Sequence, residues 1–591
     1  MATRTEREAL ALRGRIPLEG AWVLLAALAG AFGVGAYALI EPDEGRNAAI
    51  ALEMAGGSGW LVPHLDGLPF LDKPFLFFAA AAAAIRLFGA AEWAVRLPSL
   101  LATWATLGLT LWFSRRLFGR ETAWVAGTAF ATAPLTLAYA RIVIFDALLT
   151  FFVTLALIAF YLAIEERRGD AGRARRILWP MVAWAAMAGG VFTKGPVALL
   201  LPLLVAVPFA AWRRRPGAVW HPAGWLLHLA LVVPWVALVE RAVPGFLHYS
   251  LVTESWQRLT TDAMDRTGPP WYFLPVLAGG AFPWIVVALA AGWRRAREAM
   301  RGEQRPALVF LGLWIALPLV FLSLSHSKRP GYVLPLMPAV ALLAAWSWSL
   351  AGARRRTVRV AAVGWLALSV PFLAVGGGLA PARLLAKVAS RVPPTAAALG
   401  AVMLVTAALA WLAARQRLAP AALSLPLVLL PVLCAPLMAE IAESRSSKAM
   451  AAAVAPLLDP ATTVMGIETF SSTLAFYLGR KITVSTASGA PLRSNYAVHL
   501  YPEVAGLESS PLQPPEAWRD ALASCARPHV FLLKTRYERE RAALAAAGLP
   551  TLWADERLIL MGPCRPPGPP VEEAGAKRLR GGQRGTIGPG P

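Results

Sequence analysis

The stretch EPDEGRNAAIALEMAGGSGWLVPHLDGLPFLDKP, residues 41–74, follows the first apolar run of the chain and gathers charged side chains directly beside it. Charged groups are costly in hydrocarbon, so those at its edge are candidates for function. We therefore expect residues 41–93 to form an external loop that supplies one wall of a site at the membrane surface. The ionisable residues that carry this expectation are Asp43, Glu44, Arg46, Asp72 and Lys73.

The composition identifies a membrane protein. Of the 591 residues, 57% are hydrophobic and 16% charged, and the mean hydropathy is +0.54, whereas soluble proteins are roughly half apolar with about a quarter of their residues charged. The net charge of +22 would suit a nucleic-acid binder, but the Arg residues form short clusters between apolar runs instead of one basic stripe. We therefore expect membrane lipids around the chain and no nucleic-acid partner.

Thirteen apolar runs of about 20 residues are long enough to cross a bilayer. A further run, 74–88, is assigned to the membrane surface, because counting it as a span would place nearly every later Arg cluster outside. With that run excluded, the Arg clusters share the side of the N-terminus, which the positive-inside rule identifies as the cytoplasm. The thirteen expected spans include 17–40, 121–140, 196–212 and 271–292.

The sequence predicts an all-α polytopic membrane protein with a small C-terminal α/β domain. Residues 1–16 form a cytoplasmic N-terminus, 17–350 a transmembrane catalytic module and 351–440 additional transmembrane helices. Because the number of spans is odd and the N-terminus is cytoplasmic, residues 441–565 are expected in the periplasm. In this segment, strand-like runs such as KITVST and HVFLLK and a helical run predict the α/β domain. The tail, 566–591, is rich in Pro and Gly and is predicted to be disordered.

The cysteines give little information about function. Cys434, Cys525 and Cys564 lack the spacing of a metal site or a redox motif. If the last two lie in an oxidising compartment they are candidates for one disulfide, and the sequence leaves that pairing open.

The ionisable residues outside the Arg clusters are expected to lie on one surface of the membrane. The first external loop contributes the residues named above, and the later external loops contribute Asp146, Lys194, Arg258 and Tyr332. A carboxylate near a hydroxyl can act as a general base, while Lys and Arg can neutralise the charge that develops on a phosphate leaving group. This combination indicates sugar transfer from a polyprenyl phosphate, whose phosphate lies at headgroup depth. No dinucleotide-binding or Walker motif indicates a soluble nucleotide donor.

Two other functions fit a protein of this class. A lipid or polysaccharide transporter is one, but transporters place charged groups near the bilayer midplane, and His228 is the one mid-span ionisable residue of the expected spans. In the other, the C-terminal domain is a binding or sensing module on an inert anchor. The concentration of motifs before residue 350 argues against that interpretation.

Several motifs, in order along 17–350, resemble those of the bacterial lipid A aminoarabinose transferases. These enzymes stand with the protein O-mannosyltransferases among the polyprenyl-phosphate-dependent glycosyltransferases of the C-type fold. The resemblance implies thirteen spans, a periplasmic C-terminal domain, and inverting transfer of a sugar from undecaprenyl phosphate to lipid A, another glycan or a protein at the inner membrane. The motifs are EPDEGR at 41–46, LDKP at 71–74, RLPS at 96–99, RIVIFDALLTFFVTLAL at 141–157, TKGP at 193–196, ESWQR at 254–258 and SKRPGYVLPLMPA at 327–339.

The resemblance also implies roles for individual residues. Asp43 matches the catalytic acidic position of the first loop, and Asp146 is the competing carboxylate. Asp72 stands where those enzymes have Glu, and Ser255 where they have His, at two positions that bind a metal there. Asp72 is therefore the candidate ligand of a divalent metal, and no other cofactor is implied. The residues assigned to the substrate or the lipid phosphate are Lys73, Arg258, Tyr332, Lys194, Glu44 and Arg46.

Overall fold

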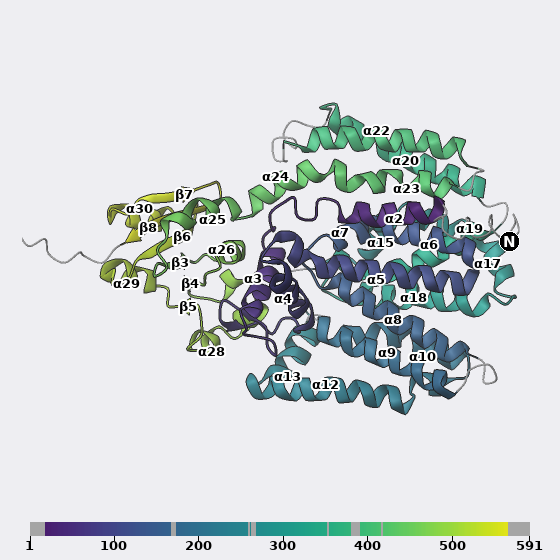
Figure 1. Ribbon diagram of the computed structural model, residues 1–591, viewed down its shortest axis with the longest axis horizontal. Helices are drawn as coiled ribbons and strands as arrows, with labels where there is room; N and C mark the ends of the chain where they lie inside the picture. Colours follow the sequence, from purple (N-terminus) through teal and green to yellow (C-terminus); the bar gives the residue numbers. More distant parts are fainter. Residues whose placement is uncertain are drawn as a thin grey trace, which may run out of the picture.

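The computed structural model of the chain describes residues 18–166, 173–257, 261, 267–350, 354–379, 390–414 and 418–564. The predicted N-terminal segment 1–16, the candidate Arg258 and the predicted tail 566–591 lie outside the described residues. The described chain forms a bundle of long helices with a smaller sheet domain at one end, and the first described helix, α2 (Leu18–Ala31), begins at the opposite end of the bundle (Figure 1).

The bundle is built from apolar helices that pack side by side (Figure 1). Its largest hydrophobic cluster includes Phe160, Trp284, Trp314 and Trp365, and the indole of Trp284 donates to Thr132 Oγ1 at 2.9 Å. The helices are α2 (Leu18–Ala31), α5 (Glu92–Phe118), α6 (Arg120–Thr132), α7 (Pro134–Ala140), α8 (Asp146–Glu165), α9 (Arg173–Lys194), α10 (Val197–Trp212), α11 (Pro216–Val219), α12 (Pro222–Ala242), α15 (Phe273–Gly280), α16 (Trp284–Leu289), α17 (Gly292–Ala299), α18 (Arg305–Leu324), η2 (Pro330–Leu336), α19 (Met337–Ser349), α20 (Arg354–Gly376), α22 (Val392–Leu412), α23 (Ala419–Leu433) and α24 (Ala435–Arg445).

Among the described residues, eight helices are long and apolar enough to cross a membrane, or nine if the bent pair α23–α24 counts as one span. The number thirteen therefore stays a prediction. Several expected spans are short or broken: α2 has 14 residues and α10 has 16. The expected span 121–140 is divided before Pro134 and 271–292 before Trp284, which follows Pro283, because proline removes a backbone donor and disfavours a helical residue before it.

The segment between α2 and α5 forms a compact unit, called the first loop, between the bundle and the sheet domain (Figure 1). It contains α3 (Asp43–Ala55), a hairpin of β1 (His64–Leu65) and β2 (Leu68–Pro69), and α4 (Leu76–Phe88). Helix α4 has 13 residues, a length of about 20 Å, whereas the hydrocarbon core is about 30 Å thick. The helix alone is too short to cross the hydrocarbon core, and the assignment of 74–88 to the membrane surface stays a prediction.

The C-terminal domain is a six-stranded mixed sheet with helices on both faces, which confirms the predicted fold class. The strand order is β5-β4-β3-β6-β8-β7, in which β5, β4, β3 and β6 are parallel and β8 runs antiparallel to both of its neighbours, β6 and β7. Cys525 and Cys564 form a disulfide. The elements are α25 (Lys448–Val454), η3 (Ala455–Leu457), β3 (Thr463–Ile467), α26 (Ser472–Leu478), β4 (Ile482–Ser485), η4 (Ala490–Leu492), α27 (Asn495–His499), α28 (Tyr501–Ala505), β5 (Leu512–Gln513), α29 (Ala517–Ser524), β6 (His529–Lys534), α30 (Glu538–Ala546), β7 (Thr551–Ala554) and β8 (Leu558–Cys564).

The C-terminal domain docks on the first loop through Glu41. The carboxylate of Glu41 accepts hydrogen bonds from Ser472 Oγ at 2.9 Å and from the backbone N–H of Thr473 at 2.7 Å, at the start of α26. Helix α3 approaches α26 so closely that a Cβ on Gly45 would lie 2.6 Å from Thr473 Cγ2. The domain is therefore fixed directly against the residues that precede Asp43.

A second contact joins the β1–β2 hairpin to the sheet. Asp66, in the turn of the hairpin, is buried and accepts the backbone N–H of Ile482 at 2.7 Å. Burial raises the pKa of the Asp66 carboxyl to about 7. The hairpin therefore carries a titratable group into the interface with the C-terminal domain.

Candidate active site

Asp43 is the first residue of α3, and its carboxylate lies between two arginines. Arg46 Nη2 is 2.7 Å from Asp43 Oδ1, and Arg329 Nη1 is 3.5 Å from Asp43 Oδ2. Arg46 also donates from Nη1 to the backbone carbonyl of Arg493 at 3.0 Å. The Asp43 side chain is 36% exposed and lines a polar cavity, so this carboxylate is accessible to a substrate.

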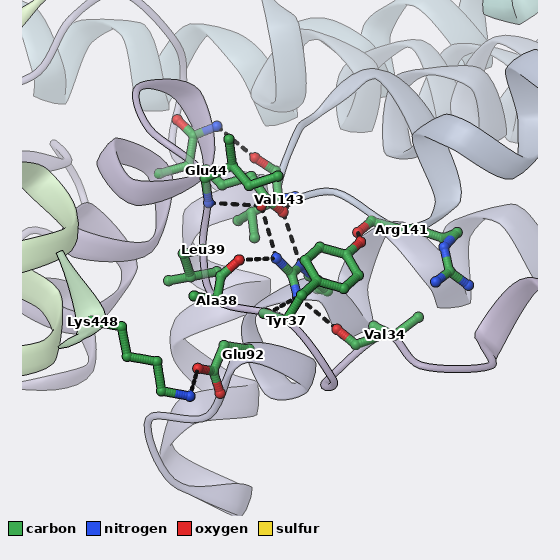
Figure 2. A network of polar contacts seen from close by, with 12 residues as sticks. Val34, Tyr37, Ala38, Leu39, Glu44, Glu92, Arg141, Val143 and Lys448 are labelled. Carbon is green, nitrogen blue, oxygen red and sulfur yellow. Dashed lines mark hydrogen bonds and ion pairs between the residues drawn. The ribbon is translucent and has the colours of Figure 1, made fainter. Parts of the chain in front are cut away.

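Glu44, the next residue, faces away from solvent and meets the buried Arg96 of α5. Arg96 donates from Nε and Nη2 to the two carboxylate oxygens of Glu44 at 2.9 and 2.8 Å, and from Nη1 to the carbonyl of Val34 at 2.6 Å. The backbone N–H of Val143 also donates to the Glu44 carboxylate, at 3.0 Å (Figure 2). These donors occupy the Glu44 carboxylate, so its geometry supports bracing of α3 more strongly than the predicted substrate contact.

Lys73 follows the β1–β2 hairpin and points toward the loop that follows α12. Its ammonium forms an ion pair with Glu254, which lies in the π-helix η1 (Tyr249–Gln257) after the short helix α13 (Phe246–His248). Lys73 also donates to the backbone carbonyl of Asp72, and its Nζ lies 5.9 Å from the ring centroid of Phe145. The Lys73 side chain, which is 12% exposed, therefore lies between two loops.

Asp146 and Lys194 form the second ion pair of the site. Asp146 begins α8 and Lys194 ends α9, and their charged atoms lie 2.6 Å apart in a mostly buried setting. Lys194 Nζ also lies 5.5 Å from the centroid of the Phe145 ring and 4.9 Å from that of Tyr332. Lys73 and Lys194 therefore flank the same aromatic ring.

Two cavities meet at these cations. The first, of about 450 Å³, is the more polar of the two and is called the polar cavity; its lining includes Asp43, Arg329 and Asp146. The second, of about 350 Å³, is lined largely by apolar side chains such as Leu200 and Phe321. The residues that line both cavities are Asp72, Lys73, Lys194 and Tyr332. An amphiphile with an apolar tail and an anionic head matches this arrangement.

The residues around Asp72 do not fit a metal ion. One carboxylate oxygen accepts the Tyr249 hydroxyl at 2.6 Å and the backbone N–H of Tyr496 at 2.9 Å. The other accepts the backbone N–H of Asn495 at 2.8 Å. Within the described ranges, no group of three or more His, Cys, Asp or Glu is placed to hold a metal ion. Asp72 as a metal ligand stays a prediction, and no chemical step below depends on a metal.

The structure brings together the predicted Asp43, Arg46, Lys73, Asp146, Lys194 and Tyr332 around the polar cavity, whereas Arg258 lies outside the described residues. The sequence analysis assigned no role to three residues of the cavity lining that come from distant segments: Arg445, Arg493 and Asn495. Only the fold places these residues beside the first loop, because they follow it by about 400 residues. Lys328, the lysine of the motif at 327–339, instead donates to the carbonyls of Ser323 and Ser325 at 2.9 and 2.7 Å, and burial lowers its pKa.

The sequence resembles known transferases in its first half. Residues 72–238 match the family model described as dolichyl-phosphate-mannose-protein mannosyltransferase. The undecaprenyl phosphate-alpha-4-amino-4-deoxy-L-arabinose arabinosyl transferase of Erwinia tasmaniensis is 32% identical over 311 residues, 52% of this chain and 55% of that protein. The corresponding protein 1 of Pseudomonas fluorescens is 32% identical over 317 residues, with coverages of 52% and 55%. The chain thus spans about half the length of the curated relatives it matches.

The likeness in structure extends further along the chain. The crystal structure of ArnT from Cupriavidus metallidurans bound to undecaprenyl phosphate superposes with a TM-score of 0.76 at 25% identity, over 91% of this chain and 97% of that one. Its apo form gives a TM-score of 0.74 at 26% identity, over 91% and 96%. These findings confirm the likeness predicted from the motifs, and with the apolar helices they identify a multi-pass inner-membrane protein.

Proposed function

We propose that this chain, which has the C-type fold of the aminoarabinose transferases, is a membrane glycosyltransferase. It moves a sugar from a polyprenyl phosphate, such as undecaprenyl phosphate, to an envelope acceptor. The observation that carries this proposal is the junction of the two cavities at Lys73, Lys194 and Tyr332. The apolar cavity offers a place for the first isoprene units, and the cations at its inner end offer a place for the phosphate.

The acceptor enters the polar cavity in this proposal. Besides Asp43, that cavity is lined by Arg329, Arg445 and Arg493, from three separate segments of the chain. Arginine binds phosphate and carboxylate groups through charge-assisted hydrogen bonds. The arginines therefore favour an anionic acceptor, and among lipid A, other glycans and proteins they favour the phosphate-bearing lipid A.

The chemical step is a single displacement with inversion. An acceptor oxygen attacks the anomeric carbon as the bond from that carbon to the lipid phosphate oxygen breaks. The negative charge that develops on the departing phosphate is offset by Lys73, with Lys194 behind the same aromatic ring. Both Asp43 and Asp146 line the polar cavity and pair with a cation. Asp43 takes the proton of the acceptor hydroxyl, because its side chain is 36% exposed whereas that of Asp146 is 6% exposed.

We further propose that the N-terminus is cytoplasmic and that the C-terminal domain and the site face the periplasm. The start of α2 and the C-terminal domain lie at opposite ends of the bundle (Figure 1), and the basic helix α17 lies at the same end as the start of α2. The positive-inside rule assigns that end to the cytoplasm. The Cys525–Cys564 disulfide supports an oxidising compartment for the other end.

Mass spectrometry of the envelope lipids and glycans tests this function. We expect deletion of the gene to remove one sugar modification from an envelope molecule, and the wild-type chain to restore it. The Asp43→Asn variant, at equal membrane abundance, should leave the modification absent while the unmodified acceptor accumulates. An unchanged profile of envelope lipids, glycans and glycoproteins in the deletion strain would overturn the proposal.

A further inference from the structure

Glu254 joins the donor site to the C-terminal domain. One of its carboxylate oxygens pairs with the ammonium of Lys73, and the other accepts a hydrogen bond from Asn495 Nδ2 at 3.0 Å. Glu254 is buried, so solvent screens these contacts weakly. The carboxylate therefore lies between the cation assigned to the lipid phosphate and an amide from a segment 241 residues further along the chain.

The position of Asn495 is fixed by the loop that carries Lys73. The backbone N–H groups of Asn495 and Tyr496 both donate to the carboxylate of Asp72, at 2.8 and 2.9 Å. Asp72 directly precedes Lys73, and the side chain of Ser494 caps α27 by accepting the N–H of Ala497. Because its backbone is tied to residue 72, the Asn495 amide is held at a constant place relative to the Lys73 ammonium.

The Glu254 carboxylate lies beside the Lys73 ammonium, where the donor phosphate binds in the proposed function. Glu254 is an anion that pairs with the Lys73 ammonium at the junction of the two cavities, and in the proposed function the donor phosphate is a second anion that binds the same ammonium. Two anions on one poorly solvated cation repel each other. A phosphate that approaches Lys73 must therefore displace the Glu254 carboxylate, and the hydrogen bond from Asn495 opposes that displacement.

We infer that Asn495, acting through Glu254, is a positioning residue that sets the affinity of the site for the lipid phosphate. In the donor-free protein, Glu254 holds Lys73 and Asn495 holds Glu254. Donor binding exchanges the Glu254–Lys73 ion pair for a phosphate–Lys73 ion pair. The C-terminal domain thereby takes part in donor binding through a side chain of its own. This inference rests on the proposed function, because it takes Lys73 as the phosphate ligand.

The test is a double-mutant cycle on the full chain in nanodiscs, with undecaprenyl phosphate as the probe and equilibrium Kd as the readout. We expect Glu254→Gln, which removes the competing charge, to tighten binding about 10-fold. Asn495→Ala should tighten it about threefold, and the double variant should bind no more tightly than Glu254→Gln alone, because Asn495 acts through Glu254. The matched control is Glu503→Gln, which removes an exposed carboxylate of α28 in the same domain and should leave Kd unchanged.

Tighter binding is a result that general damage to the fold would not produce. Unchanged or weaker binding by Glu254→Gln would overturn the inference, as would additive effects in the double variant. If Glu254→Gln does not fold, Asn495→Ala decides alone, and unchanged or weaker binding by that variant overturns the inference.

Lys73→Ala in the same assay separates failure of this inference from failure of the proposed function. If Lys73→Ala binds undecaprenyl phosphate as tightly as the wild type, the phosphate assignment itself fails and the inference fails with it. If Lys73→Ala loses affinity while Glu254→Gln gains none, the inference alone is overturned.

Discussion

Replacement of Asp43 by Asn tests the assignment of the general base. Asn is nearly isosteric with Asp and keeps a hydrogen-bonding oxygen for Arg46, but it cannot take up the acceptor proton. The Asp43 side chain is 36% exposed, so loss of its pairs with Arg46 and Arg329 should lower the free energy of unfolding by under about 1 kcal/mol. Loss of a positioned base lowers turnover by on the order of 10²- to 10⁴-fold. We therefore expect a folded protein with almost no activity.

The assay is single-turnover transfer at saturating donor, which reports the chemical step and not binding. The affinity for undecaprenyl phosphate is measured alongside it and should stay near the wild-type value, because Asp43 does not line the apolar cavity. Asp146→Asn is the comparison variant. Near-normal turnover by Asp43→Asn, together with complete loss in a folded Asp146→Asn, would refute the reasoning and assign the base to Asp146.

Three other predictions concern stability and sidedness. Arg96→Lys should lower the free energy of unfolding by roughly 3–5 kcal/mol, because lysine cannot replace the paired donors that a buried guanidinium supplies; a melting temperature equal to wild type would contradict this. Burial raises the pKa of Asp66 from 3.8 to about 7. The contribution of the neutral Asp66 carboxyl to the free energy of unfolding is therefore fully present below about pH 4 and is lost as the pH rises through 7, by roughly 4 kcal/mol in total. Asp66→Asn should flatten that part of the melting profile between pH 4 and 8, and identical profiles would rule the effect out. Cysteines introduced at the exposed Ser58 and Ser509 should react with an impermeant thiol reagent in cells with a permeabilised outer membrane, whereas one at Glu303 should not; the reverse pattern would invert the topology.

The local parts of the site could be predicted from the sequence. Asp43 begins a new helix directly after Pro42, and Lys73 lies next to a helix of only 13 residues. These features follow from apolar run length and from the position of charged residues, which a single sequence displays. The fold class followed from the same patterns, because long apolar runs and a change to mixed polar sequence are visible without a structure.

Long-range contacts could not be predicted in this way. The Glu44 carboxylate is occupied by Arg96, 52 residues away, and Asn495 meets Asp72 across 423 residues. A lone Arg or Asn carries no pattern that identifies its partner. The span count was also hard to predict, since hydropathy does not distinguish one helix from two short ones, such as α6 and α7, that meet at Pro134.

The central claim is that Lys73 holds the lipid phosphate where the apolar and polar cavities meet. Equilibrium binding of undecaprenyl phosphate to the Lys73→Ala and Lys448→Ala variants tests it most directly. Lys448 also pairs with a glutamate, Glu92, at 2.5 Å, but it lines neither of these cavities. Loss of a charge-assisted contact of roughly 2–3 kcal/mol predicts about 30- to 150-fold weaker binding for Lys73→Ala and no change for Lys448→Ala. Equal affinities for the two variants would contradict the claim.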